Sequence, residues 1–190
     1  MVAKCSLINT SKLNGRVNGM SPEIETARLK FRPFTLDDVD ALHQMWIHPD
    51  VRKYLCDDKI IPREEVASLI EKSIACFQTN NFGIWGVFLR EAEILIGFGG
   101  FWYFHTPPEL EMIYGVAPEY WNRGYATEIA KATIKYGFEQ LGFDLIVANA
   151  DAPNIASLRV MQKAGMKFEK AAKVNNLDLV LYSISRSEWE

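Results

Sequence analysis

The chain has 190 residues, 48% of them hydrophobic, and a formal net charge of −3 at pH 7. This length and composition suit one domain with a substantial core. Because the net charge provides no broad basic surface, neither nucleic acid nor an anionic membrane is expected as a partner. A monomer and a homodimer both remain open.

Residues 1–21 are rich in Ser, Asn and Gly and carry Lys4, Lys12 and Arg16 without any acid. Their low helical amphipathicity favours a disordered or added tail over a transit peptide, so we expect a single domain over residues 22–190. No run approaches the roughly 18 apolar residues that span a bilayer, and the N-terminus lacks a secretory apolar core. The sequence therefore predicts a cytoplasmic protein.

Strand and helix patterns alternate from residue 28 onward. Residues 28–34 alternate apolar and basic side chains, as a half-buried strand does, and Thr35 with Asp38 forms a capping box. The helix that follows directs Val39, Leu42 and Trp46 inward. A second helix opens at Pro62 and carries an apolar stripe of Val66, Leu69, Ile70, Ile74 and Phe77.

The second half of the chain contains further strands and two helices. Strands are expected at 84–89, 94–104, 110–116, 144–150 and 178–185, and helices at about 126–140 and 154–164. The first two strands form a hairpin, and Gly97, Gly99 and Gly100 indicate a bulge or a close backbone approach. Because the passage from 110 to 150 requires a parallel pair with a crossover, we predict a mixed sheet with helices packed on it.

The segment Ala117–Ile134 contains the most informative glycine. After a strand, a loop with Gly124 opens a helix near Ala126, so several backbone N–H groups without helical partners point to one place. Gly124 permits positive φ and close approach of a phosphate, and Asn122 also tolerates left-handed geometry. The loop predicts an anion seat, although a simple chain reversal remains an equal alternative.

Other cofactor patterns are missing from the sequence. Neither GxGxxG nor GxxxxGK[ST] occurs, which argues against dinucleotide-binding oxidoreductases and P-loop NTPases. The thiols Cys5, Cys56 and Cys76 lack metal-ligand spacing and are interpreted as free. His43, His48 and His105 are likewise interpreted as structural, so no metal is expected.

Four ordered motifs resemble one family. "WNRGYATEIAKA" resembles the pyrophosphate loop [QR]xxGx[GA] of the GNAT superfamily of acyl-CoA-dependent N-acyltransferases, and "EMIYGVAPEYWNRGYATE" resembles its ribosomal-protein N-terminal acetyltransferase branch (RimJ/RimL type). "IETARLKFRPFTLDDVDALHQMW", the following loop "HPDVRKYL" and "NADAPNIASLRVMQKAGMKFE" match further segments of that branch in order. The resemblance covers about residues 24–185.

The resemblance implies a fold and a cofactor site. The fold class is α+β, with a central, mostly antiparallel sheet, one parallel splayed strand pair and helices on both faces. Acetyl-CoA is the implied acyl donor, with its pantetheine arm between strands 110–116 and 144–150 and near the backbone of Val116. The implied pyrophosphate-loop residues are Trp121, Asn122, Arg123, Gly124, Tyr125, Ala126 and Thr127.

The resemblance also suggests catalytic residues. Glu111 matches the family's glutamate and is the expected base, although Glu109 shares its face of the strand and a solvated strand-end acid is an open alternative. Asn154 would hold pantetheine or simply cap a helix. Ser157 would bond the sulfur or donate a proton. Met161 stands where many members have a tyrosine acid, and a thioether cannot donate a proton.

Together these features predict transfer of an acetyl group to a primary amine by direct attack. A protein or peptide α-amine is the expected acceptor, with polyamines, aminoglycosides or other small amines as alternatives. A non-catalytic acyl-CoA-binding module on the same fold is the second hypothesis.

Overall fold

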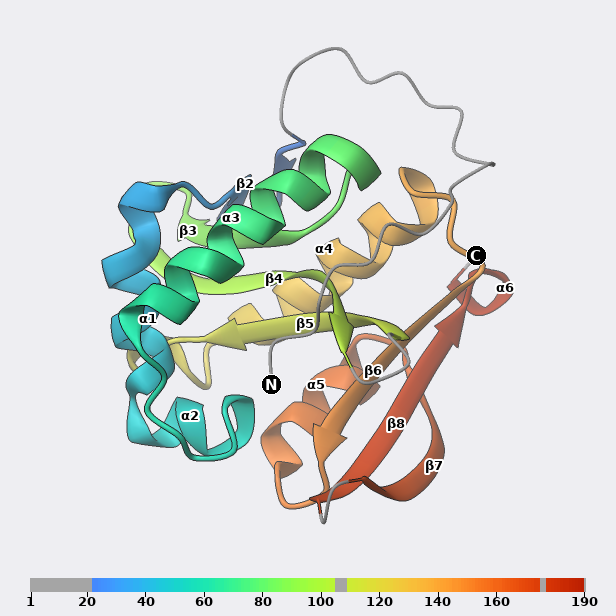
Figure 1. Ribbon diagram of the computed structural model, residues 1–190. Helices are drawn as coiled ribbons and strands as arrows, with labels where there is room; N and C mark the ends of the chain where they lie inside the picture. Colours follow the sequence, from blue (N-terminus) through green and yellow to red (C-terminus); the bar gives the residue numbers. More distant parts are fainter. Residues whose placement is uncertain (1–21, 105–108, 175–176, 190) are drawn as a thin grey trace.

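The computed structural model describes residues 22–104, 109–174 and 177–189 (Figure 1). The predictions for residues 1–21, including Cys5, and for His105 lie outside this part of the chain. The strands are β1 Ile24–Glu25, β2 Leu29–Pro33, β3 Ile84–Leu89, β4 Leu95–Phe104, β5 Glu109–Val116, β6 Leu145–Asp151, β7 Lys167–Val174 and β8 Leu177–Ser185. The α-helices are α1 Val39–Ile47, α2 Pro49–Leu55, α3 Arg63–Asn80, α4 Tyr125–Glu139, α5 Ile155–Lys163 and α6 Arg186–Trp189. Short 3₁₀ turns cover Leu36–Asp38 and Pro118–Tyr120.

The strands form two antiparallel sheets. One has the order β1-β2-β3-β4-β5 and the other the order β6-β8-β7. Strands β5 and β6 are neighbours that run in the same general direction, joined by the crossover helix α4, but they diverge and belong to different sheets (Figure 1). The predicted splayed parallel pair is therefore present, and its separation divides the expected mixed sheet into two.

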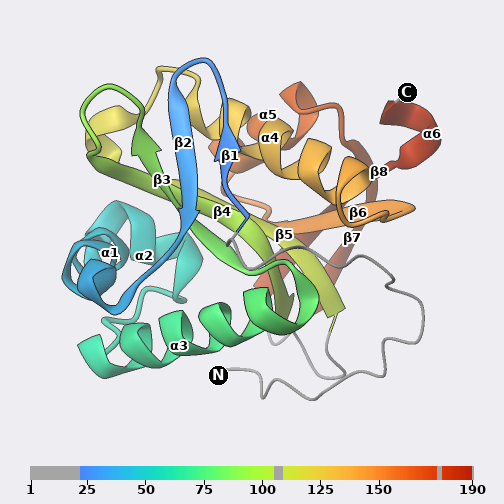
Figure 2. The ribbon, with the colours of Figure 1, turned by 90° about the horizontal axis from the view of Figure 1, so that it is seen from above.

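Helices cover both faces of the larger sheet, as predicted (Figure 2). On one face, the Phe98 ring of β4 packs edge-on against Trp46 of α1, with centroids 5.5 Å apart. On the other face, a Cβ at Gly99 would overlap Ile129 of α4. Since successive strand residues point to opposite faces, α1 and α4 lie on opposite sides of β4. The glycines of β4 thus allow close approach, as the sequence indicated.

The first predicted helix start is confirmed in detail. Thr35 and Asp38 form the capping box, and Asp38 accepts two hydrogen bonds from the Arg32 guanidinium, at 2.7 and 2.9 Å. Burial alone would raise the pKa of Asp38, but the hydrogen bonds from Arg32 and Thr35 outweigh it and lower that pKa. This partly buried ion pair fixes the entry of α1 against β2.

The apolar stripe of α3 also faces the core as predicted. Val66, Leu69, Ile70 and Phe77 are buried, and Ile74 is partly buried against them. Buried side chains of both sheets belong to one continuous hydrophobic cluster, which extends from Leu29 to Ile184. None of the described helices is both long and apolar enough to cross a membrane.

Besides the short elements β1 and α6, which were not predicted, two longer elements were missed or misassigned. "HPDVRKYL" was expected as a loop but contains helix α2, which begins at Pro49. His48 caps this helix, and its side chain accepts a hydrogen bond from the Asp50 N–H. Strand β7 was not predicted, because half of its residues are charged and its side chains at 167–173 are all exposed, which leaves no apolar alternation. It is an edge strand that pairs with β8, and charged residues are common on such edges.

Candidate functional site

The loop from β5 to α4 has the backbone geometry of the predicted anion seat. Asn122 and Gly124 have φ values of 59° and 80°, and α4 begins directly after Gly124, at Tyr125. No side chain caps this helix start. Ala126 and Thr127 complete the first turn, so their backbone N–H groups have no acceptor from an earlier helical turn. A Cβ at Gly124 would meet only Arg28, at 3.6 Å, so the backbone conformation and not crowding requires glycine.

Trp121 closes this loop onto the end of β5. Its indole N–H donates to the Val116 carbonyl at 2.6 Å. A carbonyl oxygen has a second lone pair, so Val116 can still accept another hydrogen bond. Arg123 belongs to the loop, and its guanidinium lies 5.7 Å from the Tyr120 ring centre. Trp121 therefore connects the two places expected to contact the cofactor.

Strand β5 directs its candidate residues to opposite faces. Tyr114 pairs with Gly99, which faces α4, whereas Gly115 pairs with Phe98, which faces α1. Glu111 shares the face of Gly115, since the two are an even number of positions, four, apart along the strand. Glu111 is therefore on the α1 side of the sheet, and Tyr114 is on the side of α4 and α5.

Glu111 is only 4% exposed, whereas Glu109 is exposed. The alternative of a solvated strand-end acid thus describes Glu109 and is wrong for Glu111. A carboxyl group is costly to bury, which makes a buried one a candidate for function. The two acids that the sequence left open therefore have different surroundings.

A pair of hydroxyl groups connects β5 with α5. The Tyr114 hydroxyl lies 2.8 Å from Ser157 Oγ and donates to the Ser157 carbonyl at 3.0 Å. Burial raises the pKa of Tyr114 to about 12, although the bond to Ser157 opposes the shift. Tyr114 is therefore a neutral hydrogen-bond donor over the physiological range, on the side of the strand where β5 and β6 diverge.

Asn154 and Ser157 lie at the start of α5. The Asn154 side-chain oxygen accepts from the Ser157 N–H at 3.2 Å, so the helix-cap alternative for Asn154 is confirmed. Its amide NH₂ group is a separate donor, so the cap is compatible with binding a ligand. Met161 is completely buried and takes part in the core.

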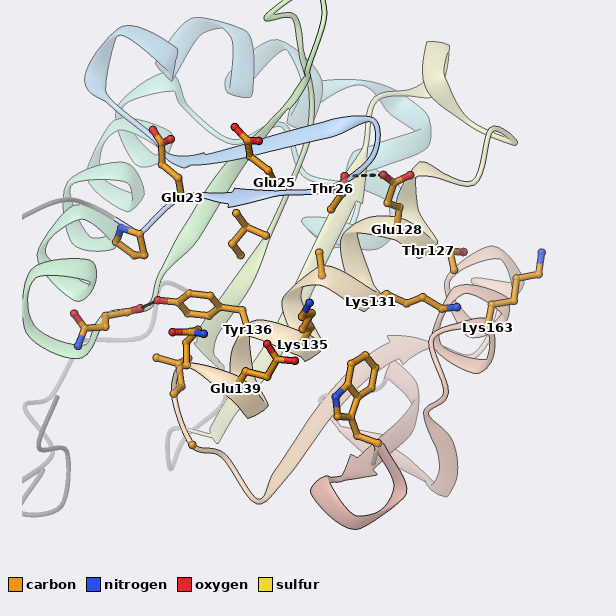
Figure 3. Close-up of a pocket in the computed structure, with 18 of the residues that line it drawn as sticks. Glu23, Glu25, Thr26, Thr127, Glu128, Lys131, Lys135, Tyr136, Glu139 and Lys163 are labelled. Atoms are coloured by element: carbon orange, nitrogen blue, oxygen red, sulfur yellow. Dashed lines mark hydrogen bonds between the residues drawn. The ribbon is translucent and has the colours of Figure 1, made fainter. Parts of the chain in front are cut away.

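A groove lies along α4, outside the gap between β5 and β6. It has a volume of about 1320 Å³, and Gly124 and Thr127 are among its lining residues, of which Figure 3 labels Thr127. Lys131, Lys135 and Lys163 lie along the groove together with several glutamates. The groove thus touches the anion seat but contains neither Glu111 nor Ser157.

The remaining candidates have structural surroundings. His43 bonds the Ile61 carbonyl at 3.0 Å, and His48 caps α2. Cys56 is a free thiol, and burial raises its pKa to about 11, whereas Cys76 is buried and accepts a hydrogen bond from the Asn80 amide at 3.4 Å. Within the described segments, no group of three or more His, Cys, Asp or Glu side chains is arranged to hold a metal ion.

Sequence reasoning gave no role to Thr26, Arg28 or Tyr114. All three occur inside the quoted motifs, but their contacts are to residues far along the chain. The alternation of β5 could have placed Tyr114 opposite Glu111, whereas nothing local indicates that residues 26–28 reach α4.

Similarity to known proteins agrees with this geometry. The family described as "Acetyltransferase (GNAT) domain" matches residues 28–167. The uncharacterized N-acetyltransferase YnaD of Bacillus subtilis is 31% identical, over 87% of this chain and 98% of that protein. The spermidine N(1)-acetyltransferase of Escherichia coli is 25% identical, over 74% of each chain.

Solved structures share the fold. A GNAT-family acetyltransferase from Bacillus anthracis has a TM-score of 0.75 and 30% identity, covering 89% of this chain and all of that one. RimL, a ribosomal L7/L12 α-N-protein acetyltransferase solved with coenzyme A, has a TM-score of 0.73 at 16% identity, covering 86% and 98%. The predicted resemblance is thereby confirmed, and the chain belongs to the GNAT family of N-acetyltransferases.

Proposed function

We propose that this protein transfers the acetyl group of acetyl-CoA to a primary amine, and that a peptide α-amine is its preferred acceptor. One observation carries the proposal. Strands β5 and β6 diverge beside a loop in which Asn122 and Gly124 both have positive φ and after which α4 starts without a side-chain cap. An uncapped helix N-terminus with a glycine loop is suited to a pyrophosphate, and diverging strands leave backbone groups for the pantetheine arm.

The cofactor residues follow from this placement. The pyrophosphate binds the backbone of the loop from Trp121 to Thr127, and pantetheine lies between β5 and β6 near Val116. The free NH₂ of Asn154 is a donor for the pantetheine carbonyls. Acetyl-CoA is a co-substrate here, and no step requires a metal.

The reaction is a direct attack. The amine nitrogen bonds to the thioester carbonyl carbon, the C–S bond breaks, and the products are an amide and free coenzyme A. Glu111, on the α1 face, accepts the proton that the amine loses. Its burial removes competing water, which strengthens its interaction with an approaching cationic amine.

On the opposite face, Ser157 and Tyr114 stabilise the leaving sulfur. A thiolate with a pKa near ~8.5 is too weak a base to remove a proton from a hydroxyl whose pKa is about 12. The pair therefore acts by hydrogen bonding. When Tyr114 turns its proton to Ser157 Oγ, the serine proton becomes available to the sulfur. This arrangement substitutes for the tyrosine acid replaced by Met161.

The acceptor preference rests on acid–base arithmetic and on family resemblance. At pH 7, an α-amine with a pKa near ~8 is about 10% neutral, whereas a lysine amine near ~10.4 is below about 0.1% neutral. A single carboxylate base is therefore better matched to the less basic amine. A pocket that desolvates lysine would reduce this advantage. The spermidine acetyltransferase among the relatives makes polyamines the second candidate.

Release of the coenzyme A thiol tests the proposal. The substrates are a lysine-free peptide with a free N-terminus, the same peptide N-blocked with one internal lysine, spermidine and an aminoglycoside. We expect the first peptide to react fastest. Faster reaction of the blocked peptide, or of spermidine alone, would contradict the acceptor preference. If acetyl-CoA bound but none of the amines caused release of the coenzyme A thiol, the result would instead support a non-catalytic module.

A further inference from the structure

Two residues near the N-terminal end of the fold contact the first turn of α4, about 100 positions later. Thr26 Oγ1 donates to Glu128 Oε1 at 2.6 Å, and Arg28 Nε donates to Glu128 Oε2 at 2.7 Å (Figure 3 shows the Thr26 bond). The backbone N–H of Arg28 adds a third bond to this carboxylate, at 3.2 Å. Glu128 is thus connected to the turn between β1 and β2.

Arg28 also contacts the loop before α4. Its Nη1 donates to the Arg123 carbonyl at 3.0 Å, and its guanidinium lies 4.4 Å from the Tyr125 ring centre. A Cβ at Gly124 would find Arg28 Nη2 as its nearest neighbour. One side chain therefore spans the anion seat from Arg123 to Glu128, which the planar, five-donor guanidinium can do and an ammonium group cannot.

The charge of Glu128 makes this contact important for an anion. Glu128 lies one helical turn, about 6 Å along the axis, from Gly124. Burial alone would raise the pKa of Glu128, but the bonds from Thr26 and Arg28 lower it, so the carboxylate stays ionised. An ionised carboxylate this close to a bound pyrophosphate would repel it unless a cation offsets the charge.

We propose that Thr26 and Arg28 are positioning residues for the phosphate seat. They hold the loop at Arg123 and the helix at Glu128, and Arg28 neutralises the carboxylate that would otherwise oppose phosphate binding. This inference rests on the proposed function, because it assigns these residues to the donor half of that site.

Arg28→Ala tests it through two donors that differ only in the phosphate-bearing part. We expect the dissociation constant for acetyl-CoA, measured by calorimetry, to rise about tenfold or more. The kcat/KM for S-acetylpantetheine, which lacks the pyrophosphate, should be unchanged. Equal loss with both donors would indicate a general structural role and overturn the proposal, as would an unchanged affinity for acetyl-CoA.

Three further variants sharpen the test. Arg28→Ala combined with Glu128→Gln should regain part of the affinity, because the repelling charge is gone. Arg28→Lys keeps the positive charge but loses the planar guanidinium with its several donors, so we expect an intermediate loss of acetyl-CoA affinity. This variant also provides the test if Arg28→Ala fails to fold. Arg90→Ala is the matched control, since Arg90 donates to the Thr26 carbonyl and pairs with Glu25 but, within the described residues, makes no bond to the loop. Failure of the wild type to bind acetyl-CoA would reject the proposed function itself, which is a separate result.

Discussion

The two sides of the candidate site are held together in different ways. On the donor side, contacts between distant parts of the chain fix the elements, namely Arg28 with Glu128 and Tyr114 with Ser157, and the local bond of Trp121 to Val116 holds the loop. On the α1 side, helix α2 has no buried residue, and Ile60 after it is 68% exposed. Asp57 and Asp58, between α2 and α3, both have positive φ.

This difference fits the demands on each side. A common cofactor requires the same geometry in each reaction cycle, and long-range hydrogen bonds provide it. The acceptor proposed above would enter on the α1 side, where Glu111 lies, and a short helix without buried residues such as α2 tolerates substitution between relatives. The donor side is therefore where substitutions should have large and specific effects.

The largest effect is expected at the loop. Gly124→Asp places a carboxylate against the phosphates and forces a non-glycine residue to a φ of 80°, so we expect acetyl-CoA affinity to fall by about 100-fold or more. Gly124→Ala is the control for backbone strain alone, which costs about 1 kcal/mol, and should bind far better than the aspartate variant. If calorimetry gave the folded Gly124→Asp and Gly124→Ala variants the same affinity for acetyl-CoA, the anion seat would be rejected.

Glu111→Gln should have the next largest effect, and mainly on turnover. Loss of the base is expected to lower kcat by roughly 100-fold, while acetyl-CoA affinity is kept. Glu109→Gln is the matched control on the same face of β5, and its exposed side chain should leave the rate unchanged. The reverse result would show that the base is Glu109.

A smaller effect is expected for Tyr114→Phe, which removes one hydroxyl from the pair with Ser157. We predict a loss of about tenfold in kcat with little change in KM for acetyl-CoA, and a similar loss for Ser157→Ala. Because the two hydroxyl groups act together, the double variant should cost little more than either single one. Fully additive losses would show that they act independently.

The Tyr114 variant also gives a pH test. Because burial raises the pKa of Tyr114 to about 12, the hydroxyl stays protonated at every pH where the enzyme is assayed. The wild type and Tyr114→Phe should therefore share the same alkaline limb below pH ~10. A limb present only in the wild type would mean that Tyr114 loses its proton during turnover.

Much of the fold could be predicted because its signals are local. The capping box at Thr35, the apolar stripe of α3 and the alternation in β2 each arise from a few neighbouring residues, and the structure agrees with all of them. Helix α2 and strand β7 were not predicted, because α2 buries no side chain and β7 depends on pairing with β8.

By itself, the sequence determined the order of the elements, the family and the backbone freedom of Gly124. These depend on residue type and on short spacings, which a chain carries before it folds. The tertiary structure decided that Glu111 is buried while Glu109 is exposed, that Tyr114 meets Ser157, and that Arg28 spans the phosphate loop. Each of these depends on which distant segments pack together, and no local pattern records that choice.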